Sequence, residues 1–312
     1  MHLNILLIVA IGLALVHFGL PLAYCYYLKK WLGRPWDLRR DSGYRPRVTI
    51  VVPTYNEASL IRGKLDNIAS QDYPRELVEI IVVDSASSDG TPSIVREWME
   101  SHRDFKVILV EEGVRRGKAF SLNNALKFAS GEVVVVTDAD SLWMSRDTLA
   151  NALSWFSNSG VGAVTCLKTP VGKGFAGIEK RYRDFYNIIR LGDSKKFSTP
   201  VFHGELAAFR KSLLQELGGF PTNIGADDSH TATLIALRGY RAIAVDNALC
   251  TELAPGKECH MWRIRRAQHL INPWLLPVAT IILLRKALIG SLTALTLLVA
   301  GAALLTLKPY RI

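Results

Sequence analysis

The stretch Gly131–Ser141, which reads GEVVVVTDADS, decides the fold of this 312-residue chain. Val133–Val136 is an unbroken β-branched run, typical of a strand buried on both faces of a sheet. The run leads into Asp138 and Asp140. Open α/β sheets place ligands at the carboxyl ends of their strands. A hard divalent cation that also touches substrate phosphate would suit these two carboxylates, although an Asx-rich turn has the same sequence.

Apolar runs and helical patterns alternate on both sides of this stretch. Strands are expected at 48–53, 80–83, 107–110, 133–136 and 161–166, with helices ending near 70, 101, 129 and 156. This order predicts an α/β fold with a doubly wound, mostly parallel sheet and helices on both faces. Three of the expected strand ends carry Asp or Glu, which favours one shared site over three unrelated solvated loops.

Composition and charge point to a membrane surface. The chain is 49% hydrophobic with a net charge of +10, and its mean hydropathy is +0.16. Basic residues crowd 29–47 and 257–266, beside apolar stretches. This placement favours anionic lipid and the positive-inside rule, so no nucleic-acid partner is expected. The four cysteines lack metal or redox spacing, which predicts reduced thiols.

Two apolar segments are long enough to cross a membrane. Residues 3–23 carry no formal charge, and at ~1.5 Å per residue they span a ~30 Å hydrocarbon core. A retained anchor is favoured over a cleaved signal peptide, because no basic residue precedes the run. Residues 287–307 form the second segment, and 273–284 is short and holds two prolines, so the number of C-terminal spans stays open.

These patterns predict five parts. They are an N-terminal transmembrane anchor (1–28), a basic juxtamembrane linker (29–46), the main domain (47–257), a basic interfacial helix (258–272) and C-terminal membrane segments (273–312). The protein is expected to be integral to the cell membrane with its main domain cytoplasmic. Aromatic residues from Tyr24 to Trp36 would form an interfacial belt. A basic amphipathic helix near 175–190 either lies at the membrane or packs on the sheet.

Four segments together carry a family resemblance. VVPTYNE (51–57), VVDSASSDGT (82–91), GKAFSLNNALKFASGE (117–132) and VVVVTDAD (133–140), in this order, resemble family-2 glycosyltransferases with the GT-A fold. The resemblance covers roughly 46–270 and implies a nucleotide-sugar donor, inversion at the anomeric carbon and a Mg²⁺ or Mn²⁺ cofactor. By resemblance, the donor-binding residues are Pro53, Thr54, Tyr55, Glu57, Asp84 and Lys118.

The same resemblance assigns the metal. Asp138 would reach the ribose or the metal, and Asp140 the metal. Ser85 stands where the family often has a second acid, so a UDP-sugar and a GDP-sugar both stay open.

The acceptor side follows from two later segments. Gly204 opens a stretch that matches the family's segment under the acceptor, and Asp227-Asp228 matches its acidic pair, in which the second acid is the catalytic base. A base is needed because an acceptor hydroxyl loses its proton as it attacks the sugar. Asp227 would keep the local field negative. Acids at a helix start also favour the helix dipole, which is the simpler explanation of the pair.

A last motif bears on processivity. Cellulose and hyaluronan synthases carry Gln-x-x-Arg-Trp where this chain has Arg263, Arg266 and Ala267 at the matched positions. Arg263 would contact substrate and Arg266 would neutralise the leaving diphosphate. The missing Trp argues against processive synthesis.

The resulting hypothesis is a sugar transfer to a lipid, lipid-linked or glycan acceptor among membrane lipids. A polysaccharide synthase and a non-catalytic sugar-nucleotide-binding membrane protein are the alternatives.

Overall fold

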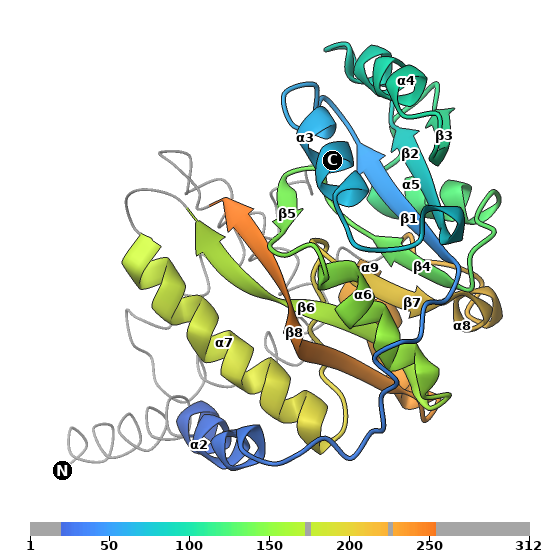
Figure 1. Cartoon of the computed structure of the whole chain (residues 1–312). Helices are drawn as coiled ribbons and strands as arrows, with labels where there is room; N and C mark the ends of the chain where they lie inside the picture. The colour runs from blue at the N-terminus through green and yellow to red at the C-terminus, as the bar shows by residue number, and fades with distance from the viewer. Residues whose placement is uncertain (1–19, 172–175, 224–226, 254–312) are drawn as a thin grey trace, which may run out of the picture. The chain divides into compact units, whose positions relative to one another are not determined.

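The computed structural model describes residues 20–171, 176–223 and 227–253. Within them, eight strands form one sheet in the order β3-β2-β1-β4-β7-β6-β8-β5 (Figure 1). The sheet has a wholly parallel half and a mixed half, and the candidate site lies where these halves meet, at the end of β4.

The first half is parallel, as predicted. It consists of β1 (Val48–Thr54), β2 (Val78–Asp84), β3 (Lys106–Glu111) and β4 (Val133–Val136). The connections contain α3 (Ile61–Ala69), a 3-10 turn at Arg75–Leu77, α4 (Thr91–Ser101) and α5 (Lys118–Leu126). Thr54 pairs with Asp84 in the β1–β2 register, so the polar ends of these strands lie side by side.

The second half is mixed, because β7 and β5 run against the other six strands, and the sheet as a whole is mostly parallel, as predicted. β7 (Ala207–Arg210) is antiparallel to both β4 and β6 (Val161–Val171). β8 (Arg241–Leu253) is parallel to β6, and β5 (Ser141–Trp143) is antiparallel to β8. A strand buried on both faces is uniformly apolar in either direction, so its sequence does not indicate which way it runs.

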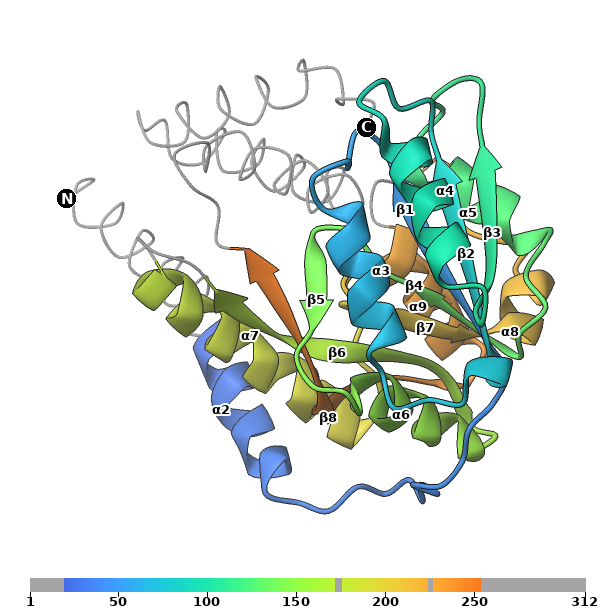
Figure 2. The same ribbon diagram turned by 45° about the horizontal axis from the view of Figure 1, so that its top comes forward.

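Helices cover both faces of the sheet, as predicted. Ile50 and Val52 face a core that includes Leu65 of α3, whereas Val51 faces a second core that includes Leu122 of α5. The first face also carries α6 (Thr148–Leu153) and a 3-10 turn at Ser154–Ser157. The second face carries α8 (Lys211–Glu216) and α9 (Asp227–Leu237). Figure 2 shows α3 and α6 in front of the sheet.

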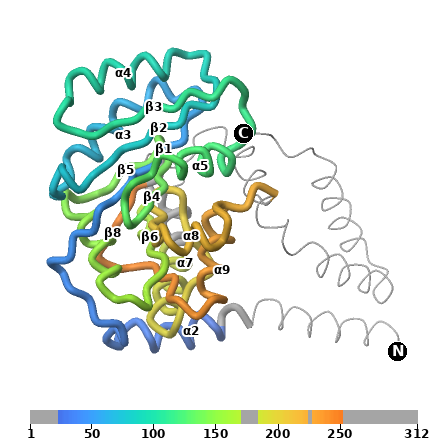
Figure 3. The backbone as a smooth tube through the Cα atoms, turned by 90° about the vertical axis from the view of Figure 1, so that its right-hand side faces the viewer, coloured from blue at the N-terminus to red at the C-terminus, as the bar shows by residue number. Residues whose placement is uncertain are grey.

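The N-terminal part begins with α2 (Leu20–Leu32), and residues 33–47 then lead to β1 (Figure 3). No helix in the described ranges is both long and apolar enough to cross a membrane. The predicted N-terminal span lies outside the described residues except for its end, and the predicted interfacial helix and C-terminal segments lie wholly outside them. All of these membrane segments therefore stay predictions.

The segment predicted as a juxtamembrane linker packs on the main domain. The ring of Trp36 lies 4.6 Å from that of Trp155, and Asp37 pairs with Arg241 at 2.8 Å. Trp36 therefore takes part in the packing of this domain, and the predicted aromatic belt stays a prediction.

The basic helix near 175–190 is part of α7 (Ala176–Lys196). In its described half, Asn187 donates to the backbone of Lys168 on β6 at 2.9 Å, and Ser194 accepts from the backbone N–H of Ala244 on β8 at 2.8 Å. Of the two alternatives, packing on the sheet is the one that these residues show.

Candidate active site

A group of hydrogen-bonded side chains lies at the carboxyl ends of β1 and β2, and we call it the floor: Thr54, Asp84 and Ser87. Thr54 Oγ1 donates to Asp84 Oδ1 at 3.1 Å. The Ser87 hydroxyl donates to the same oxygen at 2.6 Å and its backbone N–H donates to Asp84 Oδ2 at 2.9 Å. Asp84 is almost fully buried. The structure therefore brings together Thr54 and Asp84, and adds Ser87, which the sequence motifs did not single out.

Tyr55 stands at the rim of this floor. Its ring is half-exposed, and the guanidinium of Arg115 lies 3.6 Å from the ring centre, within the range of a cation–π contact. Arg115 comes from the loop between β3 and α5, so two segments far apart in sequence meet here. The backbone N–H of Glu57 donates to Thr91 Oγ1 at 2.9 Å, which ties this segment to the start of α4. Pro53 lies within β1, opposite Val83.

A second group of side chains lies where β4 ends, and we call it the charge cluster: Lys118, Asp138, Asp227 and Asp228. Lys118 Nζ and Asp138 Oδ1 are 2.6 Å apart. Burial alone would lower the pKa of Lys118, but the carboxylates of Asp138, Asp227 and Asp228 outweigh it and raise that pKa. Burial would likewise raise the pKa of Asp138, and Lys118 holds it below its usual range. Both groups are therefore charged at neutral pH.

Gly204 makes room for this pair. A Cβ at residue 204 would overlap Asp138 Oδ2 and approach Lys118 Nζ to 2.9 Å. The backbone N–H of Asp138 also donates to the carbonyl of Gly204 at 2.8 Å. Gly204 therefore lies against the Lys118–Asp138 pair, and its lack of a side chain has a steric reason. Its predicted place under the acceptor stays a prediction.

Asp227 and Asp228 open α9, as the acidic pair predicted. Burial, and then the neighbouring Asp227 charge, raise the pKa of Asp228 from 3.8 to about 7. Asp227 Oδ2 is buried and accepts no hydrogen bond from the residues that the structure describes. A carboxyl group whose pKa lies close to neutrality can act as a general base at the pH of a cell.

Asp140 lies at the exposed end of the loop that follows β4. Within the described ranges, no group of three or more His, Cys, Asp or Glu side chains could hold a metal ion alone. Asp138 already pairs with Lys118. The oxygen donors fit a hard cation that takes one or two protein carboxylates and completes its shell with water and phosphate. Asp138 and Asp140 therefore both stay predicted ligands of the cation.

Three buried polar residues behind the site were missed by the sequence analysis: Lys64, Lys168 and Glu205. Lys168 and Glu205 form a buried ion pair, and Glu205 directly follows Gly204. Lys64 is fully buried on α3. Its spacing from Ile61 and Ile68 places it on the buried stripe of that helix, which is the signal that could have revealed it. The predicted Arg263 and Arg266 lie outside the described residues.

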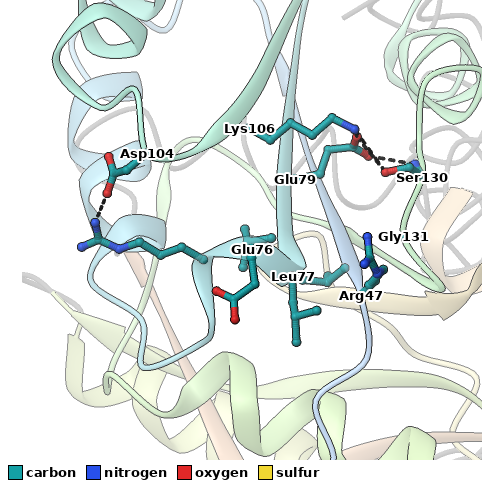
Figure 4. A pocket seen from close by; sticks show the side chains of 11 residues that line it. Arg47, Glu76, Leu77, Glu79, Asp104, Lys106, Ser130 and Gly131 are labelled. Atoms are coloured by element: carbon teal, nitrogen blue, oxygen red, sulfur yellow. Dashed lines mark hydrogen bonds and ion pairs between the residues drawn. The ribbon is translucent and has the colours of Figure 1, made fainter.

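A cavity of about 160 Å³ lies at the opposite edge of the sheet, where β1 and β2 begin (Figure 4). Four of its charged side chains form ion pairs, Arg75 with Asp104 and Glu79 with Lys106. This cavity is separated from the candidate site by the length of the strands, and nothing in its chemistry matches the predicted donor.

The matched family model is decisive. The model described as "Glycosyl transferase family 2" matches residues 49–218, which hold the floor, Lys118, Asp138, Asp140 and Gly204. The chain belongs to glycosyl transferase family 2. The prediction of a family-2 glycosyltransferase with a GT-A-like fold is thereby confirmed.

The solved and curated relatives of this glycosyltransferase include one at high identity. The chain is 52% identical to the mannosyltransferase PcManGT from Pyrobaculum calidifontis over 98% of this chain and 94% of that one, with a TM-score of 0.79. That structure is a complex with GDP-Man and Mn²⁺, in agreement with the predicted Mg²⁺ or Mn²⁺.

Curated relatives are more distant. A poly-β-1,6-N-acetyl-D-glucosamine synthase from Staphylococcus epidermidis is 28% identical over 86% of this chain, which covers 65% of that protein. Glycosyltransferase AglE from Haloferax volcanii is 27% identical over 74% of this chain and 75% of its own length.

Proposed function

We propose that this chain is an inverting, metal-dependent glycosyltransferase that moves mannose from GDP-mannose to an acceptor hydroxyl or phosphate. The observation that carries the donor is the 52% identity to a mannosyltransferase held with GDP-Man and Mn²⁺, over 98% of this chain. The charge cluster supports the chemistry, because it sets one ammonium and three carboxylates around the end of β4.

The residues divide the work between binding and transfer. Thr54 and Asp84 form the floor for the nucleoside, with Tyr55 at its rim. Asp140 holds the divalent cation, which offsets the charge of the leaving nucleoside diphosphate. Lys118 lies beside that diphosphate as a compact positive charge. Asp228 takes the proton of the acceptor hydroxyl as that oxygen attacks from the face opposite the leaving group.

A lipid or lipid-linked acceptor is part of the proposal. It is supported by the apolar segments 3–23 and 287–307 and by Tyr24, Tyr26 and Tyr27, which are exposed on α2 just before Lys29 and Lys30. Interfacial aromatic and basic residues of this kind suit a membrane surface. We place the catalytic domain in the cytoplasm, where nucleotide sugars are made available. Protease digestion of sealed cells should then leave 29–47 intact, and cleavage there would contradict this placement.

A polysaccharide synthase is the second candidate. The Staphylococcus epidermidis relative favours it, whereas Ala267 replaces the Trp of the processive motif. One experiment separates the candidates: nucleoside diphosphate release is measured with GDP-mannose and with UDP-N-acetylglucosamine, each with membrane lipid extract and Mn²⁺. We expect release from GDP-mannose and a product bearing one sugar. Turnover of the UDP-sugar alone, or a long polymer, would instead support the synthase.

A further inference from the structure

Lys64 is a buried lysine that makes no ion pair in the described part of the chain. Its side chain is 0% exposed. Nζ donates to the backbone oxygen of Ser141 at 2.9 Å and to Ser141 Oγ at 3.3 Å, and it lies 4.8 Å from the centre of the Trp143 ring. Burial lowers the pKa of Lys64 to about 8. Enclosing an amine is costly even when it donates hydrogen bonds, so a lysine at this position calls for an explanation.

The contacts of Lys64 converge on the metal loop, which we define as Asp138–Ser141. Ser141 directly follows Asp140, the proposed metal ligand. The Ser141 hydroxyl that accepts from Lys64 also donates to the backbone oxygen of Asp138 at 2.9 Å. One buried amine therefore fixes the far end of the loop directly and its near end through a single hydroxyl.

The rest of β5 is held by side chains other than Lys64. Asn67 of α3 accepts from the backbone N–H of Trp143 at 2.9 Å and donates to its carbonyl at 3.0 Å. Trp143 Nε1 donates to the backbone of Glu205 at 2.9 Å. Since these bonds secure β5 itself, the loss of Lys64 should act on the metal loop and leave β5 in place.

We propose that Lys64 is a positioning residue for the metal: it holds the Asp138–Ser141 loop in the conformation in which Asp140 accepts a divalent cation. This inference rests on the proposed metal-dependent function. Residues that orient metal ligands without touching the metal typically contribute about 10–100-fold to metal affinity.

The test compares two variants of the full-length protein. Mn²⁺ affinity is measured by electron paramagnetic resonance of the free ion, with saturating GDP, and thermal unfolding is followed in parallel. Lys64→Met should weaken Mn²⁺ binding by about 10-fold or more, with a Tm equal to or above that of the wild type because a buried amine is removed.

The matched control is Gln71→Met. Gln71 lies just beyond the same helix and donates to the backbone of Ser145 at 3.1 Å, two residues after the end of β5. This variant should lower the Tm and leave Mn²⁺ affinity unchanged. A purely structural lysine would give the reverse pattern for Lys64→Met, with a lower Tm and wild-type Mn²⁺ affinity.

A third variant, which changes less of the structure, keeps the inference testable if Lys64→Met does not fold. Ser141→Ala keeps the backbone acceptor of Lys64 and removes the hydroxyl link to Asp138, so Mn²⁺ binding should weaken by a smaller factor than in Lys64→Met. Wild-type Mn²⁺ affinity in both Lys64→Met and Ser141→Ala would overturn this inference alone. A wild-type protein that binds no Mn²⁺ with GDP would overturn the metal-dependent function, and this inference with it.

Discussion

The carboxylates at the two ends of the candidate site differ in how completely other side chains compensate their charge. At the floor, Asp84 accepts three hydrogen bonds from Thr54 and Ser87. In the charge cluster, three carboxylates lie around the ammonium of Lys118, and Asp227 Oδ2 accepts no hydrogen bond from any described residue. The floor is complete without a ligand, whereas the charge cluster holds more negative charge than its own residues neutralise.

This difference indicates that the floor binds the donor and that the charge cluster takes part in the transfer reaction. A carboxylate with saturated hydrogen bonds is fixed in place and changes little during a reaction. An excess of negative charge stabilises an incoming cation and raises the pKa of a neighbouring acid. Substitutions at the floor should therefore change donor affinity, and substitutions around the charge cluster should change the rate of transfer.

Asp140→Ala should have the largest effect. Without this carboxylate the divalent cation loses a protein ligand, and transfer should fall to background because the leaving diphosphate keeps its full charge. Mannose transfer from GDP-mannose is measured with saturating Mn²⁺. Retention of full activity by the purified variant, or by the wild type in excess chelator, would contradict the metal assignment.

Asp228→Asn should have the next largest effect. The amide keeps the shape of the side chain and cannot take a proton, so the transfer rate should fall by about 10²–10⁴-fold. Donor affinity should change little, because the base acts in the transition state. Asp227→Asn is the matched control and should lower the transfer rate by a smaller factor. If Asp227→Asn were the inactive variant, the assignment of the pair would be displaced by one residue.

Asp84→Asn should have a smaller effect, on binding alone. Its hydrogen bonds to Thr54 and Ser87 involve a charged acceptor, and such bonds contribute about 1.5–3 kcal/mol. The KM for the donor should rise by about tenfold while kcat stays close to that of the wild type. A fall in kcat with an unchanged KM would contradict the division between floor and charge cluster.

The smallest effect is a pH dependence. Because the pKa of Asp228 is raised to about 7, kcat/KM should decline as pH falls below about 7 and the base becomes protonated. The folded pKa exceeds the ordinary value of 3.8, so the folded state binds more protons and loses stability as pH rises from 3.8 to about 7. Asp228→Asn should therefore have a higher Tm than the wild type at pH 8, and this advantage should vanish near pH 4. An equal Tm difference at both values would be inconsistent with the raised pKa.

The parallel half of the fold could be predicted from the sequence because its signals are local. Val133–Val136 is the observed β4, and the run at 48–53 lies within β1. β8 was missed because Asp246 and Asn247 interrupt its apolar pattern, and β5 has only three residues. Such strands are defined by their neighbours and not by their own periodicity.

The residues of the candidate site likewise fall into those that the sequence could predict and those that it could not. Residues that end a predicted strand or open a predicted helix, such as Asp84, Asp138 and Asp228, could be placed from the motifs. Lys64 and Arg115 could not, because their roles come from contacts with Ser141 and Tyr55, which are distant in sequence. A burial pattern can show that a lysine faces the core, but it does not show what that lysine touches.

The glycine at 204 limits how this enzyme can be redesigned. Any side chain there would displace the Lys118–Asp138 pair, so a library that varies the acceptor-side segment should keep residue 204 fixed. Variation at this position would select for repair of the ion pair before it could select for a new acceptor. Changes of acceptor preference should therefore be sought at positions of this segment that do not touch the pair.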